Sequence, residues 1–244
     1  MENKPNDSNA ELADYWALAA TPSGRASLTL RARSKRFTWN AVIGTTITLK
    51  RLFDIFGSIC ALIALSPILA VTAIFIKVED PGPVFFTQKR VGLKGRSFLI
   101  WKFRSMINDA EKVAQRMIAL DQAKDTVEMK LAGDPRITKT GKFIRKYSID
   151  ELPQFWNVFL GDMSIVGPRP VILAEVADYT VEERQRLLAK PGLTCIWQVG
   201  GRTDLDFENQ VRLDVEYIRS TSLWLDIKLL LLTIPAVLLG KGAY

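Results

Sequence analysis

IFGSICALIALSPILAVTAIFI, residues 55–76, is a run of 22 residues without a charged side chain. As one helix it would measure roughly 33 Å, which is about the thickness of the hydrocarbon core of a membrane. A buried helix of a soluble domain is the alternative, but few soluble helices are apolar on every face. A cleaved signal peptide fits poorly, because the run begins about 50 residues into the chain. This stretch therefore predicts a membrane-embedded helix.

Basic residues stand on both sides of the run. Lys50 and Arg51 precede it, and five more follow it: Lys77, Lys89, Arg90, Lys94 and Arg96. This distribution favours the cytoplasm for both ends of the helix. Near the middle, Pro67 removes a backbone hydrogen bond, and the Ser66 hydroxyl can satisfy the carbonyl that this frees. A helix that enters the membrane, bends at Ser66-Pro67 and returns to the same face fits these facts. A kinked spanning helix fits the charges equally well.

The composition restricts the chemistry. The 244-residue chain contains no histidine, which excludes Ser-His-Asp and Cys-His nucleophile systems and histidine metal sites. Cys60 and Cys195 lack the spacing of zinc ligands, and because Cys60 lies in the apolar run a disulfide is not expected. Carboxylates, lysine, tyrosine, serine or cysteine must therefore carry any nucleophilic or acid–base step. The mean hydropathy of +0.08 is compatible with one or two membrane-associated segments.

The net charge is +7, and basic residues gather just before the apolar run. Residues 21–53 hold no acid and seven basic residues, namely Arg25, Arg31, Arg33, Lys35, Arg36, Lys50 and Arg51. Attraction to anionic lipid headgroups is the simpler interpretation of a basic cluster next to an apolar segment. Nucleic-acid binding is the alternative, but the chain has no recognisable motif for it, so no nucleic-acid partner is expected.

Patterning divides the chain into three parts. Residues 1–46 are polar and aperiodic and are predicted to be a flexible tail, and residues 47–78 are the membrane helix. Beyond them, VFFTQKRV (84–91) and SFLIWKF (97–103) flank a glycine-bounded turn and predict a hairpin. Helices are expected at 107–131, 181–190 and 204–220, and the apolar run 229–240 is too short to span and suits an interfacial or core helix.

Asp150 and Glu151 precede an amphipathic helix that ends at Gly161. A capping box formed by Ser148 and Glu151 is one interpretation, but it would place Pro153 at a helical position where its missing N–H costs a bond. A helix that starts at Asp150 avoids this cost, and Asp150 could then be only its N-cap. At the positive end of a helix dipole both carboxylates would favour the ionised form, which can attack phosphorus or bind a metal.

Basic residues near this pair suggest a diphosphate site. Lys142, Arg145 and Lys146 lie just before it, and Arg169 and Arg202 lie in later loops bounded by glycine or proline. Guanidinium groups suit multidentate binding of phosphate. A charge cluster is usually a solvated surface, but arginines in rigid loops beside paired acids fit a diphosphate better.

The string SIDELPQFWNVFLGDMSIVGPRP (148–170) closely resembles the signature of the bacterial sugar transferase family, the monotopic phosphoglycosyl transferases that initiate surface polysaccharides. Further resembling segments cover roughly residues 48–244: KRLFDIFGS (50–58), DPGPVFFTQKRVG (80–92), KFRSM (102–106), KPGLTCIWQVGGR (190–202) and SLWLDIKLLLLTI (222–234). Cys195 departs from the family, in which a glycine is expected at this position.

The resemblance implies a specific reaction. Asp150 would attack the β-phosphate of a UDP-sugar, release UMP and form a phosphosugar–aspartyl intermediate, which undecaprenyl phosphate then resolves. Glu151 would hold Mg²⁺. Arg145 would contact phosphate and Arg169 the nucleotide, and Lys102 matches a site position of the family. Two further substrate-binding residues are expected, Arg202 and Asp226.

The resemblance also implies an architecture. We expect a mostly helical α+β protein, monotopic in the bacterial inner membrane, with a re-entrant helix broken at Ser66-Pro67, a small β-hairpin, interfacial helices and a cytosolic catalytic domain over 79–244. The short form and the ending GKGAY (240–244) resemble members that start exopolysaccharides with hexoses, which favours UDP-galactose or UDP-glucose. A non-catalytic membrane-anchored scaffold of a polysaccharide-export system is the alternative function. The oligomeric state is left open.

Overall fold

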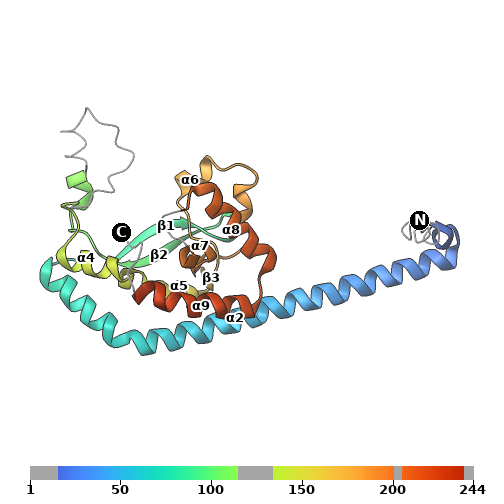
Figure 1. Cartoon of the computed structure of the whole chain (residues 1–244), viewed down its shortest axis with the longest axis horizontal. Coiled ribbons are helices and arrows are strands. Elements are labelled where there is room, and N and C mark those ends of the chain that lie inside the picture. Colours follow the sequence, from blue (N-terminus) through green and yellow to red (C-terminus); the bar gives the residue numbers. More distant parts are fainter. Residues whose placement is uncertain (1–15, 115–133, 201–204, 239–244) are drawn as a thin grey trace, which may run out of the picture. The chain divides into compact units, whose positions relative to one another are not determined.

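The structure, a computed structural model, describes residues 16–114, 134–200 and 205–238. It divides into two compact units, Met1–Leu49 and Lys50–Tyr244 (Figure 1). The first unit contains a helical turn at 16–20 and the beginning of helix α2 (Pro22–Glu79). The second contains the rest of α2 and every other strand and helix named below.

Helix α2 starts earlier than expected. The prediction of a flexible tail to residue 46 differs from the structure, in which the chain is helical from Pro22. Thr21 begins this helix, because its hydroxyl accepts a hydrogen bond from the Gly24 amide (3.0 Å). Proline is favoured at the first helical position, and the Ala, Leu, Arg and Lys residues that follow have high helix propensity despite their aperiodic arrangement.

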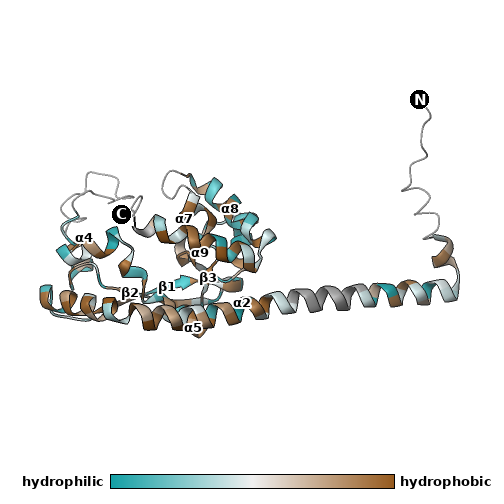
Figure 2. Cartoon of the chain, turned by 60° about the horizontal axis from the view of Figure 1, so that its bottom comes forward, coloured by the Kyte–Doolittle hydropathy of each residue, from teal (hydrophilic) through white to brown (hydrophobic). Residues whose placement is uncertain are grey.

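Among the described residues, one helix is long and apolar enough to cross a membrane, Gly44–Glu79. Figure 2 colours this part of α2 mostly brown, and Figure 1 shows the helix changing direction in its cyan part. The helix continues through Pro67 instead of ending there. The Ser66 hydroxyl donates to the Ile63 carbonyl (2.8 Å), which is the acceptor that a proline at 67 leaves without its usual donor. The predicted role of Ser66 is confirmed, and the re-entrant path stays a prediction.

The predicted hairpin is confirmed. Strands β1 (Phe85–Val91) and β2 (Ser97–Phe103) are antiparallel, with Phe85 opposite Phe103 at the open end. The turn η1 (Leu93–Gly95) uses two left-handed residues, Lys94 at φ 56° and Gly95 at φ 78°. Glycine adopts this conformation at no steric cost, which explains the glycine-bounded turn in the sequence.

The segment that holds the acid pair differs from the prediction. After α4 (Lys139–Lys146), the pair lies in the 3₁₀ turn η2 (Ile149–Glu151), and helix α5 begins only at Gln154. Ser148 is left-handed (φ 53°) and makes no side-chain capping bond, so the capping box does not form. Asp150 is not the N-cap of α5 either, because Pro153 occupies that position. The helix ends at Leu160 with Gly161 at φ 96°, as expected.

A second, parallel pair of strands was not predicted. β3 (Ser164–Val166) pairs with β4 (Gly192–Thr194). Gly167, which follows β3, and Gly192, the first residue of β4, approach so closely that a Cβ on Gly192 would lie 2.1 Å from the Gly167 nitrogen. Only two glycines allow this contact, which fixes the chain where the 167–170 loop leaves β3.

The remaining elements complete the second unit. They are α6 (Leu173–Ala177), the 3₁₀ helix η3 (Glu183–Leu188), α7 (Ile196–Gly200), α8 (Phe207–Ser220) and α9 (Leu223–Leu238). The helix expected at 204–220 is confirmed as α8, and that expected at 181–190 is 3₁₀. Of the apolar run expected at 229–240, residues 229–238 belong to α9, which starts earlier, and residues 239–240 lie outside the described residues. Of the helix expected at 107–131, residues 110–114 are helical and 115–133 lie outside the described residues.

The main core joins the hairpin, α5, β3 and the two C-terminal helices. Its buried members are Ile100, Val158, Met163, Ile165, Val166, Tyr217 and Leu229. The KRLFD motif anchors α2 to this core. Arg51 donates to the carbonyls of Val158 and Phe159 (2.7 Å each), which lie at the C-terminal end of α5. Asp54 accepts from the Ser164 hydroxyl and the Ile165 amide.

Candidate active site

Asp150 and Glu151 lie in a cleft of about 950 Å³. The hairpin, the segment after β2, the α4–η2 region, the loop after β3 and helix α7 contribute to its walls. Its basic residues outnumber its acids, which suits a polyanionic ligand: the bases are Arg90, Lys102, Arg104, Lys112, Arg136, Arg145 and Arg169, and the acids are Asp109, Glu111, Asp150 and Glu151.

Asp150 is buried, with 9% of its surface exposed. Burial, and then the neighbouring charge of Glu151, raise the pKa of the Asp150 carboxyl to about 6. The expectation that a helix dipole favours its ionised form is therefore wrong, because α5 begins four residues later and desolvation dominates. At pH 7 roughly nine-tenths of the carboxyl is still ionised. A carboxylate with a raised pKa is more basic than usual and hence a better nucleophile.

Glu151 has the opposite electrostatics. Burial alone would raise its pKa, but the Lys102 charge and hydrogen bond, followed by the charges of Arg169 and Arg90, lower the pKa of Glu151 below its ordinary value. The Lys102 Nζ lies 2.7 Å from Glu151 Oε1. The two adjacent carboxyls thus have pKa values pushed apart, an arrangement that separates chemical roles in enzyme sites.

Arg145 is directed to the cleft by the packing of α4. Thr138 caps this helix by accepting from the Gly141 amide (2.9 Å), and a Cβ on Gly141 would lie 2.0 Å from the Ser105 carbonyl oxygen. The helix therefore packs directly against the chain that leaves β2. The Arg145 Nε donates to the Ser105 hydroxyl (2.8 Å). The positive charge of Arg145 offsets part of the rise in the pKa of Asp150. The structure brings Arg145 and the acid pair together.

Arg169 lies in the loop after β3 and is exposed to the cleft. Its guanidinium carbon is 5.8 Å from the centroid of the Trp197 ring, which is a cation–π contact. The Trp197 Nε1 donates to the buried Asp214 (3.1 Å), and Arg186 forms a 2.6 Å ion pair with the same carboxylate. The hydrogen bond to Asp214 therefore fixes the Trp197 ring against which Arg169 packs.

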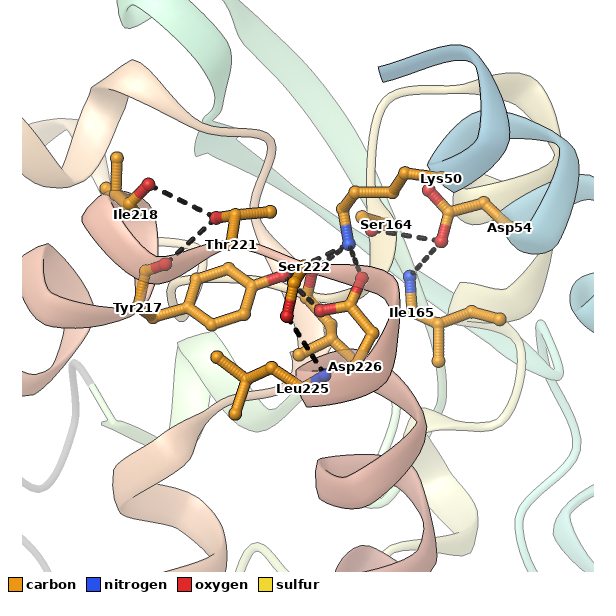
Figure 3. Close-up of polar contacts among 11 residues, drawn as sticks. Lys50, Asp54, Ser164, Ile165, Tyr217, Ile218, Thr221, Ser222, Leu225 and Asp226 are labelled. Carbon is orange, nitrogen blue, oxygen red and sulfur yellow. Dashed lines mark hydrogen bonds and ion pairs between the residues drawn. The ribbon is translucent and has the colours of Figure 1, made fainter. Parts of the chain in front are cut away.

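Asp226 does not line the cleft. Figure 3 shows it in polar contact with Lys50 and Tyr217. Its carboxylate is fully buried and accepts from the Tyr217 hydroxyl (2.6 Å) and from Lys50 Nζ (2.5 Å). Lys50 also donates to the Val166 carbonyl (3.0 Å). This group joins α2, β3, α8 and α9. Lys50 therefore helps to hold these elements together and is not only a charge beside the membrane.

Two further sequence predictions concern Arg202 and Cys195. Arg202 lies outside the described residues. Cys195 is fully buried before α7, and burial raises the pKa of its thiol well above the ordinary value. Its side chain therefore fills core space and is not a nucleophile at neutral pH.

Several residues of the cleft are not predicted by the sequence motifs. Gln88 and Arg90 alternate on β1 on the same face as Lys102 of β2, because Phe86 pairs with Lys102. This alternation could have been recognised in the sequence, because polar residues on one face of a hairpin indicate a side that faces solvent or a ligand. Burial, then Arg169, lower the pKa of Arg90. Trp197 had no such signal, because its role depends on a loop far away in sequence.

The residues present fit a divalent cation held jointly with a substrate. No group of three or more His, Cys, Asp or Glu side chains with metal-binding geometry occurs among the described residues. Mg²⁺ is, however, commonly bound through one or two carboxylates with substrate phosphates completing the shell. Glu151, held ionised at the cleft, has the chemistry of such a ligand, and the surrounding cations would hold the phosphates.

The chain is similar in sequence to known proteins. The family model described as bacterial sugar transferase matches residues 45–240. The UDP-galactose-lipid carrier transferase of Erwinia amylovora is 45% identical over 199 residues, which is 80% of this chain and 42% of that protein. The undecaprenyl-phosphate galactose phosphotransferase of Salmonella typhimurium is 44% identical over 200 residues, with 80% and 42% covered.

A shorter relative is matched over most of its length. The exopolysaccharide production protein ExoY of Sinorhizobium fredii is 40% identical over 198 residues, which is 80% of this chain and 88% of that protein. The chain therefore spans less than half the length of the first two relatives and nearly all of the third.

Proposed function

This chain belongs to the bacterial sugar transferase family, and from that premise we propose that it transfers a hexose 1-phosphate from a UDP-sugar to undecaprenyl phosphate. The observation that carries the proposal is the acid pair itself. A buried carboxylate of raised pKa stands beside an ionised one in a cleft with excess positive charge. A non-catalytic membrane scaffold has no need of such an arrangement, whose burial costs free energy.

The first step is displacement at phosphorus. An oxygen of the Asp150 carboxylate attacks the β-phosphorus of the UDP-sugar and forms a new P–O bond. The bond from that phosphorus to the bridging oxygen breaks, and the oxygen leaves with UMP and the electron pair. The sugar 1-phosphate remains on Asp150 as an acyl phosphate, which is covalent catalysis by a carboxylate nucleophile.

The second step releases this intermediate to the lipid. A phosphate oxygen of undecaprenyl phosphate attacks the same phosphorus, and the Asp150 carboxylate leaves with the bonding electrons. The product is a polyprenyl diphosphate sugar, and the enzyme returns to its starting form. Because UMP leaves before the acceptor reacts, ping-pong kinetics are expected.

The neighbouring side chains bind and neutralise phosphate. Glu151 is suited to hold Mg²⁺, which when bound offsets the charge of a diphosphate and of the leaving UMP. Arg145 is close enough to Asp150 to lower its pKa and is suited to the phosphate under attack. Arg169, exposed over Trp197, is suited to the nucleotide phosphate.

The names of relatives support galactose as the sugar, since two of them carry it. The apolar helix Gly44–Glu79 supports membrane association. We propose the cytoplasmic face of the inner membrane, where UDP-sugars are made, with α2 re-entrant at Ser66-Pro67.

UMP release tests this function. Detergent-solubilised protein is supplied with Mg²⁺, undecaprenyl phosphate and a panel of UDP-sugars, and UMP is measured. Wild-type protein is expected to release UMP, fastest from UDP-galactose, and Asp150→Asn is expected to release none. Equal, background release by both proteins across the whole panel would refute the catalytic function.

A further inference from the structure

A second cavity of about 410 Å³ adjoins the cleft, and every residue that lines it among the described part of the chain is apolar. We call it the apolar groove. Its walls come from α2, the hairpin and the start of α5. A charged or hydrogen-bonding ligand would lose its water in this groove and find few partners, at a high cost in free energy. The groove therefore excludes the nucleotide and suits a hydrocarbon.

The hairpin separates the groove from the cleft. Side chains alternate along each strand, so Phe86, Arg90 and Lys102 face the cleft while Trp101 faces the opposite side and lines the groove. The partition ends at the open end of the hairpin. There the stacked rings of Phe85 and Phe103, with centroids 5.3 Å apart, line both cavities.

The α2 wall connects the groove to the membrane. Leu62, Leu69, Ala70 and Ala73 share one side of the helix by their spacing and all belong to the uncharged run. Most of this run is exposed in the protein and therefore faces lipid when the helix is embedded. A hydrocarbon chain in the membrane can reach the groove without crossing water.

The α5 wall connects the groove to the acid pair. Pro153, two residues after Glu151, lines the groove, and Trp156 lies one turn further along. Trp156 is 45% exposed, as expected for an aromatic ring at a membrane interface. A ligand with an apolar tail along α2 and a head at Pro153 would have its polar end at Asp150.

We propose that the apolar groove binds the first isoprene units of a polyprenyl phosphate and delivers its phosphate to the cleft. The proposal rests on the proposed function, because that function supplies a lipid acceptor. Phe85 and Phe103 lie at the boundary between the two cavities. The small side chains of Ala70 and Ala73 leave room in the groove for the branched isoprene chain. The two substrates thus enter from different phases: the nucleotide sugar enters the cleft from water, and the acceptor enters through the groove from lipid.

Filling the groove tests the proposal. Ala70→Phe adds a ring at an exposed position that lines the groove, and Ala64→Phe adds the same ring at an exposed position of α2 that does not. Exchange of labelled UMP with UDP-galactose, without acceptor, reports the first step. Sugar transfer to undecaprenyl phosphate in detergent reports both steps.

We expect Ala70→Phe to retain UMP exchange and to raise the KM for undecaprenyl phosphate about tenfold, the effect of losing a few buried methylene groups. Ala64→Phe is expected to change neither. An unchanged KM in Ala70→Phe, or an equal rise in both variants, would overturn the groove assignment while leaving the function intact. Absence of UMP exchange in the wild type would instead refute the proposed function.

A second measurement does not depend on a variant. Wild-type protein is irradiated with a polyprenyl phosphate that carries a diazirine near its phosphate end, and the labelled peptides are identified. Adducts within residues 62–73 or on the hairpin support the proposal. Adducts confined to other segments contradict it.

Discussion

The ammonium of Lys102 lies 2.7 Å from the Glu151 carboxylate, and this contact joins a strand of the hairpin to the turn that holds the acid pair. The two residues are 49 positions apart in the chain. Their ion pair keeps Glu151 ionised beside Asp150, whose pKa is raised by burial and by that same negative charge. The site therefore holds one carboxylate suited to a cation and one suited to attack.

Replacing Lys102 by Met should move the pH dependence of UMP exchange. The Lys102 charge lowers the pKa of both carboxyls, so its removal raises both values and leaves less of each ionised at a given pH. In the wild type, exchange should fall as the pH drops through about 6, the pKa of Asp150. In Lys102→Met the acid limb should lie about one pH unit higher. Exchange kinetics between pH 5 and 9 measure the shift.

Lys89→Met is the matched control, because Lys89 is an exposed lysine on the opposite face of the hairpin. Its acid limb should coincide with that of the wild type. A lower rate in Lys102→Met with an unmoved acid limb would show that Lys102 does not act through these carboxyls.

Asp150→Asn should be inactive but more stable than the wild type at pH 8. The folded pKa of Asp150 is about 6, above its ordinary value of 3.8, so folding disfavours the ionised form. The unfolded state binds fewer protons between these values, and stability is lost as the pH rises through this window. Asparagine removes this cost, which is about 3 kcal/mol at pH 8 for a shift of this size. Thermal unfolding in detergent should show a higher Tm for the variant at pH 8.

The gain should shrink as the pH falls from 6 towards 4, where Asp150 is increasingly protonated in both states. Asp178→Asn changes an exposed aspartate and should leave Tm unchanged. A destabilised Asp150→Asn protein at pH 8 would contradict the account of its burial.

Lys50→Met should destabilise the protein, because it leaves the fully buried Asp226 charge without its cation. Breaking such a pair costs about 2 to 3 kcal/mol when one partner is partly exposed, as Lys50 is. The double variant Lys50→Met with Asp226→Asn removes the unpaired charge and should recover part of the lost Tm. If Asp226→Asn alone abolishes UMP exchange at unchanged Tm, Asp226 has a direct role in the reaction.

The sequence predicted local features better than contacts between distant segments. The hairpin followed from strand alternation around a glycine-bounded turn, and the Ser66 contact followed from the adjacent proline. Strands β3 and β4 have three residues each and α7 has five, which is too short for a periodic signal.

The sequence predicted Asp150 and Glu151 as site residues, and the structure places both in one cleft. It did not predict the raised pKa of Asp150, which depends on cleft walls from other segments. Lys50 and Asp226 are 176 positions apart, and no local pattern indicates their pairing. Trp197 and Asp214 are likewise joined only by the fold.

Cysteines introduced at positions 40 and 80 test the path of α2. If the helix is re-entrant, both positions should react with a membrane-impermeant thiol reagent only after the inner membrane is opened. Single-cysteine variants in a background without Cys60 and Cys195 allow each position to be measured separately. Labelling of the two positions from opposite faces would support a kinked spanning helix instead.

The central claim is that Asp150 becomes covalently bound to the sugar phosphate. Purified protein is incubated with UDP-galactose and Mg²⁺ without acceptor, quenched in acid, and measured by intact-mass and peptide mass spectrometry. We expect an added hexose phosphate on the peptide that contains Asp150, its loss on addition of undecaprenyl phosphate, and no adduct in Asp150→Asn. Lipid product without any adduct, or an adduct that persists in Asp150→Asn, would contradict it.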